Sequence, residues 1–135
     1  MRHSICVVTG SRADYGLLRP LLLRLAADDE IEFRLVVTGS HLIGGFGNTQ
    51  DEIKNDGFDV SFRIPINLKN DSDTAIAEAT GQALSAFADY FSNSRPELLV
   101  ILGDRYEIFA AASAALILNI DIAHISGGDV TEGVL

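Results

Sequence analysis

The sequence predicts an α/β fold built on a parallel sheet. Short, nearly continuous apolar runs alternate with longer segments in which apolar residues recur at three- and four-residue spacing. Such runs are typical of strands covered on both faces, and the longer segments are typical of helices. Strand and helix in alternation favour a parallel sheet with right-handed crossovers and helices on both faces. With 135 residues, we expect one domain that spans residues 1–135.

The first half of the chain predicts a strand, a helix and two further strands. Ser4–Thr9 is an apolar run, and the leucines that follow it recur along one face of a helix. Pro20 lies inside that leucine pattern, so we expect the helix either to bend there or to begin near Arg19. Glu32–Thr38 alternates in part, which is typical of a strand nearer an edge, and Asp59–Ile64 alternates more clearly.

The second half of the chain predicts two helices, each followed by a strand. Apolar residues repeat at helical spacing from about residue 73 to residue 92, where Ser72 or Asp73 is suited to cap the helix and Pro96 closes the segment. The alanine-rich stretch Tyr106–Leu118 is apolar nearly all round, so we expect it to be buried against the sheet and a neighbour. The two strands are continuous apolar runs, Leu98–Leu102 and Asp121–Ile125.

Charge and cysteine content narrow the function classes. The chain has 10 basic and 19 acidic residues, a net charge of -9, which disfavours nucleic-acid binding. Its single cysteine, Cys6, lies in the first apolar run, and we interpret it as a buried hydrophobe rather than a reactive thiol. No signal peptide and no membrane-spanning run is visible, so we expect a cytoplasmic protein. The chain ends directly after the last predicted strand, and we expect it to be part of a larger protein.

Glycine and polar residues follow each of the four apolar strands. In parallel sheets, ligands bind beyond the carboxyl ends of the strands, where these segments meet. One glycine after a strand is ordinary turn chemistry, but four such segments predict a binding or catalytic cleft. The segments are Gly10-Ser11-Arg12-Ala13-Asp14, Gly39-Ser40-His41, Gly103-Asp104-Arg105 and Ser126-Gly127-Gly128-Asp129.

Each residue of this cleft also has a plainer interpretation. Arg12 is suited to clamp a phosphate beside helix amides, or it is a surface arginine at a loop. Asp104 is a candidate acid, or an ordinary N-cap or helix-dipole partner. His41, in a loop, is a better candidate for substrate contact than His124, which we expect to be a hydrogen-bonded core histidine. The stretch Gly44–Thr49 predicts a mobile lid or a plain linker. Neither a Walker A loop, a dinucleotide fingerprint nor a metal-ligand spacing is present, so no metal and no cofactor is predicted.

Four motifs, in this order, resemble the hydrolysing UDP-N-acetylglucosamine 2-epimerases of sialic-acid-type sugar pathways. They are "TGSRADYGLLRPLL", "TGSHL…FGNT", "LGDRYEIFAAASAA" and "AHISGGDVTEG", and the resemblance extends from Ser4 to Gly133. It implies a two-domain fold of the glycosyltransferase-B type, with this chain as the Rossmann-like N-terminal domain. It also implies conversion of a UDP-2-acetamido sugar into the free 2-epimer and UDP by a cytoplasmic, commonly oligomeric enzyme without cofactors.

The resemblance also implies roles for residues at the cleft. Asp104 would be an acid/base residue near the sugar, His41 would approach the sugar, and Asp129 is a further catalytic candidate. Arg12 would face the diphosphate and Arg105 would help to hold the nucleotide. The remaining residues expected to bind the substrate are Gly10, Ser11, Asp14 and Ser126.

One departure from the family pattern concerns Ser126. Related non-hydrolysing epimerases carry a glutamate at this position, and a serine cannot replace it as a base. Asp104, Asp129 or a residue beyond Leu135 must then act as the base. Three alternatives stay open: a non-hydrolysing epimerase, a noncatalytic UDP-sugar-binding module, and a structural or regulatory α/β module.

Overall fold

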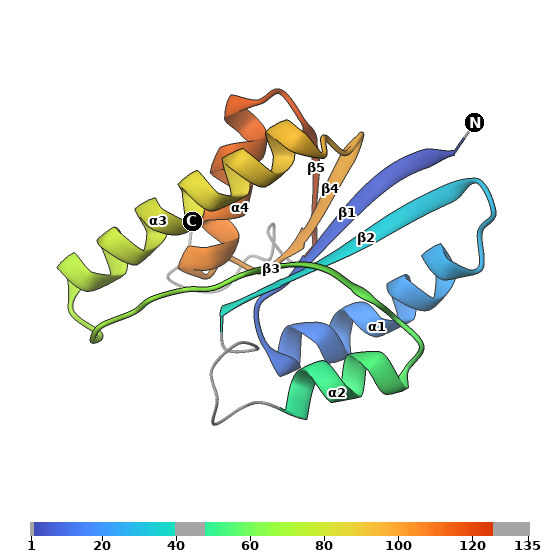
Figure 1. The fold of residues 1–135 in the computed structure, drawn as a ribbon, viewed down its shortest axis with the longest axis horizontal. Helices are drawn as coiled ribbons and strands as arrows, with labels where there is room; N and C mark the ends of the chain where they lie inside the picture. The colour runs from blue at the N-terminus through green and yellow to red at the C-terminus, as the bar shows by residue number, and fades with distance from the viewer. Residues whose placement is uncertain (1, 40–47, 126–135) are drawn as a thin grey trace, which may run out of the picture.

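The computed structural model describes residues 2–39 and 48–125, and in them five strands and four helices alternate along the chain. The strands form a single sheet, with helices packed on both of its faces (Figure 1). The strands are β1 (His3–Thr9), β2 (Ile31–Thr38), β3 (Val60–Ile64), β4 (Leu98–Leu102) and β5 (Asp121–Ile125). The helices are α1 (Arg12–Ala26), α2 (Asn48–Asn55), α3 (Asp73–Asn93) and α4 (Tyr106–Ile117).

All strand pairs in the sheet are parallel, in the order β3-β2-β1-β4-β5. The predicted fold class and all five predicted strands are therefore confirmed. The clearly alternating segment at residues 59–64 forms the edge strand β3, and β2 lies next to it. The chain reverses its direction of travel across the sheet after β3, so β1 and β4 are the central neighbours.

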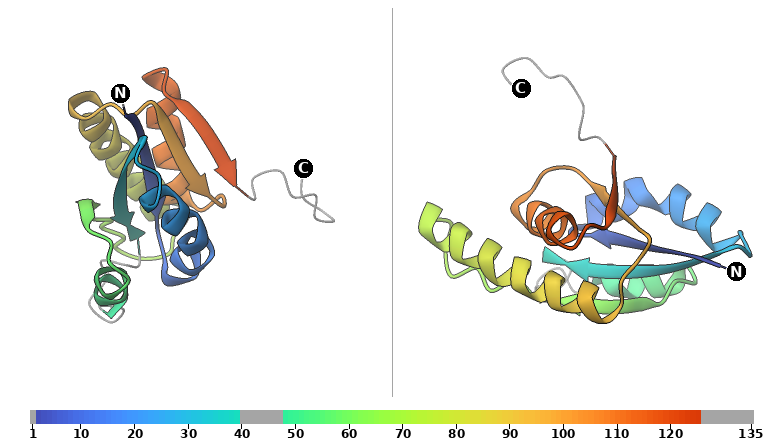
Figure 2. Two further views of the ribbon diagram at one scale, coloured as in Figure 1. Left: turned by 90° about the vertical axis from the view of Figure 1, so that its right-hand side faces the viewer. Right: turned by 90° about the horizontal axis from the view of Figure 1, so that it is seen from above.

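Alternate residues of each strand pack against different helices. On β1, Cys6 and Val8 contribute to a core with α3 and α4, whereas Val7 contributes to a second core with α1 and α2. This division follows from the strand period of two, which points successive side chains to opposite faces. Figure 2 shows the same arrangement in two further views, with the sheet between the helix pairs.

Cys6 is fully buried, as expected for a cysteine in an apolar run. Burial raises the pKa of its thiol to about 12, against the opposing effect of the Arg34 charge. The thiolate is the reactive form of cysteine, so this residue acts as a hydrophobic side chain of the core. The interpretation of Cys6 as a structural residue is confirmed.

Helix α1 begins at Arg12 and continues through Pro20 to Ala26, so the predicted start near Arg19 is wrong. Ser11 caps the helix and accepts a hydrogen bond from the Asp14 backbone N–H at 3.2 Å. A proline deprives the residue four positions earlier of its hydrogen bond. That residue is Gly16, and both it and Pro20 lie on the exposed face of α1, where water can satisfy the backbone carbonyl.

Helix α2 was not predicted from the sequence. The sequence of this helix is polar except for Ile53, whose side chain is buried. A single apolar residue is too few to produce a periodic pattern. Tertiary contacts hold it instead: the Tyr15 hydroxyl of α1 donates to Asp56 Oδ2 at 2.5 Å, and Arg19 Nε donates to the same oxygen at 3.0 Å. The predicted lid or linker at residues 44–49 lies mostly outside the described residues.

Helix α3 agrees with its prediction, with Ser72 as the N-cap. Helix α4 begins at the predicted residue and ends one residue before the predicted end, and it is buried on one side only. It packs on the sheet and on α3 through its alanines, whereas Phe109, Leu116 and Ile117 are exposed. The predicted burial of this helix against the sheet and a neighbour is therefore confirmed, and its opposite side is exposed. Among the described residues, no helix is long and apolar enough to cross a membrane.

Candidate functional site

Three glycines mark the edge of the sheet at which the strands end. Gly10 follows β1, Gly39 follows β2 and Gly103 follows β4. Because all strands are parallel, their carboxyl ends lie along one edge, as the sequence predicted. Gly39 and Gly103 have φ angles of 64° and 79°, a conformation that favours glycine. The predicted cleft therefore begins with tight turns of the backbone at a shared edge.

Gly10 and Gly39 lie against each other and against the side chain of Glu107. A Cβ atom on Gly39 would lie 2.6 Å from the Gly10 carbonyl oxygen and 3.1 Å from Glu107 Oε1. A Cβ atom on Gly10 would lie 3.0 Å from the same carboxylate oxygen. The two glycines thus let the turns after β1 and β2 close over the carboxylate of α4.

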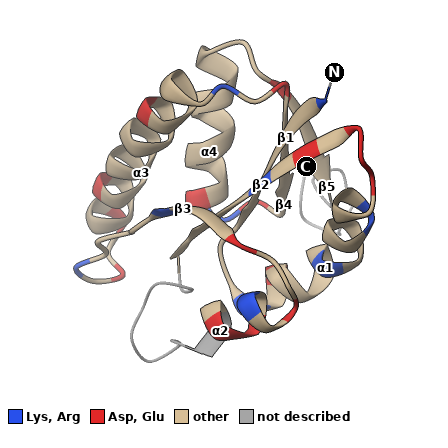
Figure 3. Cartoon of the chain, turned by 45° about the vertical axis from the view of Figure 1, so that its right-hand side comes forward, with Lys and Arg blue, Asp and Glu red and all other residues tan. Residues whose placement is uncertain are grey.

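Glu107 is a fully buried carboxylate in the first turn of α4. It is the only charged residue of this helix. Figure 3 shows α4 uncharged along most of its length. Burial raises the pKa of Glu107 and the charge of Asp14 raises it further, whereas its own backbone N–H and Arg105 lower it. Buried carboxylates with such perturbed pKa values are concentrated at functional sites.

Asp104 and Arg105 link β4 to α4. The N-cap of α4 is Arg105, without a side-chain hydrogen bond, so the alternative that Asp104 caps this helix is wrong. Both side chains are exposed. Arg105 Nε lies 2.9 Å from Glu107 Oε1 and forms an ion pair with it. An exposed cation and an exposed carboxylate therefore stand at the N-terminal end of α4, where the helix dipole favours negative charge.

The start of α1 holds the other described residues that were predicted to bind the substrate. The hydroxyl of Ser11 serves as the helix cap. Asp14 Oδ2 is buried and has no hydrogen-bond partner among the described residues. Arg12 is exposed, and its Nε lies 3.2 Å from Glu52 Oε2 of α2. Neither the phosphate role nor the surface role of Arg12 is tested by this geometry, because an exposed ion pair is compatible with both.

Several predicted site residues lie outside the described part of the chain: His41, Ser126 and Asp129. Their predicted roles stay predictions. His124 is described, and its Nε2 lies 2.5 Å from the Gly103 carbonyl oxygen. The hydrogen bond expected for this histidine is confirmed, but its burial is wrong, because β5 is an edge strand and the side chain is exposed.

Two carboxylates of this region were missed by sequence reasoning, Glu107 and Glu52. A signal for Glu107 was present: it is a lone charge in a run of apolar and alanine residues, three positions after Asp104. Helical spacing would have placed it on the buried side of α4. No such signal existed for Glu52, because it lies in a polar stretch and its partner Arg12 is distant in sequence.

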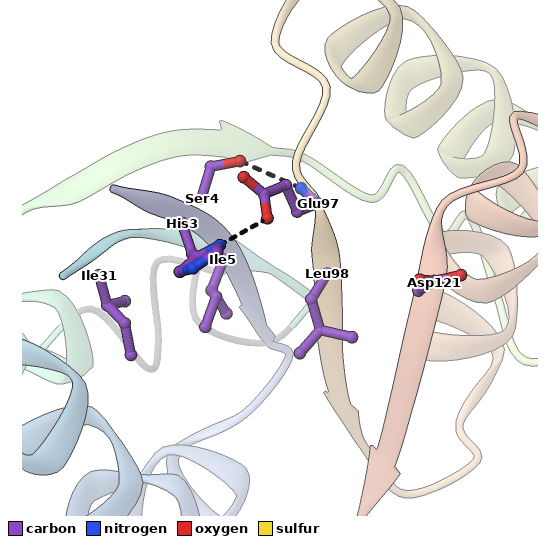
Figure 4. Close-up of a pocket in the computed structure, with 7 residues that line it drawn as sticks. All are labelled: His3, Ser4, Ile5, Ile31, Glu97, Leu98 and Asp121. Atoms are coloured by element: carbon purple, nitrogen blue, oxygen red, sulfur yellow. Dashed lines mark hydrogen bonds and ion pairs between the residues drawn. The ribbon is translucent and has the colours of Figure 1, made fainter. Parts of the chain in front are cut away.

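A hollow of about 430 Å³ lies at the opposite edge of the sheet, near the amino ends of the strands (Figure 4). Its lining residues are His3, Ser4, Ile5, Ile31, Glu97, Leu98 and Asp121. His3 Nδ1 and Glu97 Oε2 form an ion pair at 3.0 Å, which raises the pKa of His3 and lowers that of Glu97. These charges satisfy each other, and none of the predicted site residues lines this hollow.

The sequence matches a family model described as UDP-N-acetylglucosamine 2-epimerase over residues 23–135. The UDP-N,N'-diacetylbacillosamine 2-epimerase (hydrolyzing) of Legionella pneumophila is 43% identical over 129 residues, 96% of this chain and 34% of that protein. The polysialic acid biosynthesis protein P7 of Escherichia coli is 43% identical over 127 residues, 94% of this chain and 32% of that protein. The chain thus spans about a third of the length of these relatives.

Among solved structures, the UDP-GlcNAc 2-epimerase from Neisseria meningitidis bound to UDP-GlcNAc superposes with a TM-score of 0.80 at 22% identity. The match covers 96% of this chain and 34% of that one. At this level of identity the comparison establishes the shared fold.

Proposed function

This chain belongs to the UDP-N-acetylglucosamine 2-epimerase family, and we propose that it is the nucleotide-sugar-binding domain of a hydrolysing 2-epimerase. The observation that carries the proposal is the placement of Asp104, Arg105 and the N-terminal end of α4 at the carboxyl edge of the sheet. An anionic leaving group is favoured at such a point by the helix dipole and by a guanidinium. The relatives of similar sequence support the hydrolysing type.

The proposed reaction removes UDP and then adds water. A base takes the proton from C2 of the sugar, the bond between C1 and the UDP oxygen breaks, and a C1–C2 double bond forms. Water then adds its hydroxyl to C1, and an acid returns a proton to C2 from the opposite face. The products are the free 2-epimer and UDP, and every step is balanced without an oxidant or a metal ion.

The residues divide between proton transfer and charge stabilisation. Asp104 is the proposed acid/base residue, because its exposed carboxylate lies at the carboxyl edge of the sheet and precedes Arg105 in the sequence. Groups of this kind accelerate proton transfer by roughly 10²–10⁴-fold. Arg105 and Arg12 are the proposed partners of the diphosphate, whose charge grows as it leaves. His41, Asp129 and Ser126 are proposed to approach the sugar.

The proposed substrate class is a UDP-2-acetamido sugar. The Legionella relative is named for UDP-N,N'-diacetylbacillosamine, and the Escherichia coli relative for polysialic acid biosynthesis. These names support a sugar with an acetamido group at C2, the carbon at which the proposed reaction occurs. They support both UDP-N-acetylglucosamine and its 2,4-diacetamido relatives as test compounds.

We also propose that the rest of the protein supplies a second domain and that the active site forms between the two domains. The length of the relatives supports this arrangement, because the chain spans about a third of them. We further propose that the full-length enzyme is homo-oligomeric and cytoplasmic.

Incubation of the full-length protein with each UDP-sugar in D₂O, followed by proton NMR, tests this function. The expected products are UDP and the free 2-epimer with deuterium at C2. Release of a UDP-linked epimer would instead indicate the non-hydrolysing reaction. Tight UDP binding with no turnover of either sugar would indicate a noncatalytic binding module, and absence of UDP binding would indicate a structural module.

A further inference from the structure

The buried carboxylate of Glu107 has no evident structural use. Helix α4 packs through alanine and isoleucine side chains, and Glu107 is the only member of its buried side that carries a charge. Burial of a carboxylate is costly unless hydrogen bonds replace the lost water. In the described structure, neither Glu107 Oε1 nor Glu107 Oε2 has a hydrogen bond of regular geometry. A fold that needed only packing here would be more stable with an uncharged residue.

The contact that Glu107 does make is an ion pair with one end buried and the other end in solvent. Its Oε1 lies 2.9 Å from Arg105 Nε, at an angle that does not form a regular hydrogen bond. The side chain of Glu107 is 0% exposed, whereas that of Arg105 is 55% exposed. The carboxylate therefore holds the inner nitrogen of the guanidinium. Among the described residues, Glu107 is the one carboxylate that forms an ion pair with Arg105.

The backbone around this pair leaves the carboxylate little room to move. Gly10 and Gly39 close over it, and even a Cβ atom at either position would lie within 3.1 Å of Oε1. Glu107 is also in the first turn of α4, two residues after Arg105 at the N-cap. The position of the Glu107 carboxylate is thus set by three separate elements, α4 and the ends of β1 and β2.

Within residues 2–39 and 48–125, two charged groups face Glu107 from the elements packed against it. Arg105 stabilises its ionised form, and Asp14 of α1 opposes it. The turns after β1 and β2 bring glycines, which carry no charge. Burial and the negative charge of Asp14 therefore both oppose ionisation of Glu107. The group that the ionised carboxylate stabilises is the guanidinium of Arg105.

We propose that Glu107 is a positioning residue that fixes Arg105 by its Nε and so aims the two terminal nitrogens at the diphosphate of the substrate. The inference rests on the proposed function, since it assumes that Arg105 contacts the nucleotide. A guanidinium held in advance loses less conformational entropy when it binds an anion than a free side chain does. Glu107 acts through Arg105 and does not itself touch the substrate.

The test is a double-mutant cycle on UDP affinity, measured by titration calorimetry with the full-length protein. We expect Arg105→Met to weaken UDP binding about 30-fold and Glu107→Gln about tenfold, since each charged contact contributes on this scale. The double variant should bind no more than about twofold more weakly than Arg105→Met alone, because a positioning residue has no effect without its target. Glu78→Gln, at an exposed glutamate of α3, is the matched control and should bind UDP like the wild type.

The pH dependence adds a measurement that a purely structural role would not change. Because the pKa of Glu107 is raised above its ordinary value of 4.5, the wild type and Glu107→Gln should converge in UDP affinity as the pH is lowered from 8 toward 4.5. The ionisation of UDP itself affects both proteins equally and cancels in the comparison.

Several results would overturn the inference. One is an unchanged UDP affinity in Glu107→Gln, and another is a normal UDP affinity in Arg105→Met. A third is a double variant whose loss of UDP affinity equals the product of the two single losses. If Glu107→Gln does not fold, Glu107→Asp takes its place: the shorter carboxylate should lose part of the affinity, and wild-type affinity would count against the proposal. If the wild type fails to bind UDP, the proposed function itself is wrong, which the calorimetry distinguishes from loss in the variants alone.

Discussion

At the scale of single residues, the carboxyl edge combines groups that are costly to the fold. Glu107 is buried without regular hydrogen bonds, and Gly39 adopts a left-handed conformation against the Gly10 carbonyl oxygen. Such features persist where function requires them, because an uncharged or less strained alternative would be more stable. Substitutions at this edge should therefore change catalysis at Asp104 and stability at Glu107 and Gly39.

Asp104→Asn should lower kcat of the full-length enzyme by roughly 10²–10⁴-fold, the usual contribution of a positioned acid or base. UDP affinity should change little, because Asp104 is exposed and makes no described ion pair with a cation. Steady-state kinetics and calorimetry measure the two quantities. Asp89→Asn, at an exposed position of α3, is the control, and a kcat near wild type in Asp104→Asn would remove this residue from the proton transfers.

Glu107→Gln should raise the melting temperature at pH 7.5. The pKa of Glu107 is raised in the folded state above its ordinary value of 4.5, so folding favours the protonated form. The stability of the wild type is therefore full below pH 4.5 and falls as the pH rises through the higher folded pKa. Glutamine stays neutral throughout, so the gap between the two melting curves should close as the pH is lowered toward 4.5. A variant less stable than the wild type at pH 7.5 would show that the carboxylate supports the fold.

Gly39→Ala should destabilise the protein by at least about 2 kcal/mol, since the left-handed conformation alone costs about 1–2 kcal/mol with a side chain. The new Cβ would also lie 2.6 Å from the Gly10 carbonyl oxygen. Gly81→Ala is the matched control, because Gly81 lies within α3 and has open space around it. This control should gain about 0.5–1 kcal/mol, the helix preference of alanine over glycine. Equal effects at both positions, measured by thermal unfolding, would contradict the prediction.

At the scale of elements, local signals decide where a helix begins and tertiary contacts decide whether a weak helix forms. Ser72 starts α3 through its hydrogen bond from the Ala75 backbone N–H at 3.2 Å. Ser11 starts α1 in the same way, and Pro20 is tolerated because it lies on the exposed face. Helix α2, by contrast, depends on the contacts of Asp56 with Tyr15 and Arg19 of α1.

Ser72→Ala should lower the free energy of unfolding by about 1 kcal/mol, the usual contribution of an N-cap hydrogen bond. The comparison is Ser85→Ala on the exposed side of the same helix, where alanine removes no cap and slightly favours the helix. Chemical denaturation of both variants measures the difference. If the two serines respond alike, the cap contributes nothing to stability.

At the scale of the whole molecule, the sheet separates two edges with different chemistry. The amino edge carries the His3–Glu97 ion pair, whose charges are mutually satisfied beside an apolar hollow. The carboxyl edge carries Arg105 with Glu107 and a buried oxygen of Asp14 without a described partner. Asp14 and Glu107 thus place unsatisfied carboxylate oxygens on the side where we propose that a ligand binds.

Residues 1–135 alone should show no turnover of a UDP-sugar, because we propose that the active site also needs residues of a second domain. The NMR experiment in D₂O measures this directly, after circular dichroism has shown that the isolated chain is folded. The full-length protein is the positive control. Turnover by the folded 135-residue chain would place the complete active site within it.

The sequence by itself determined the fold class, the strands and the edge of the sheet at which we propose the site. These properties follow from local patterns: apolar runs form the strands, their parallel order places all carboxyl ends together, and glycine follows β1, β2 and β4 there. The motif resemblance likewise identified the family that the comparison confirms. Each of these conclusions needs only residues close together along the chain.

Only the tertiary structure decided the start of α1, the existence of α2, the exposure of His124 and the burial of Glu107. The Asp56 contacts that hold α2 and the Glu52 partner of Arg12 join residues about 40 positions apart. Glu107 is buried because turns from β1 and β2 close over it, although both are far from it in sequence. Burial and charge pairing depend on which distant segments meet, and a linear pattern does not contain that information.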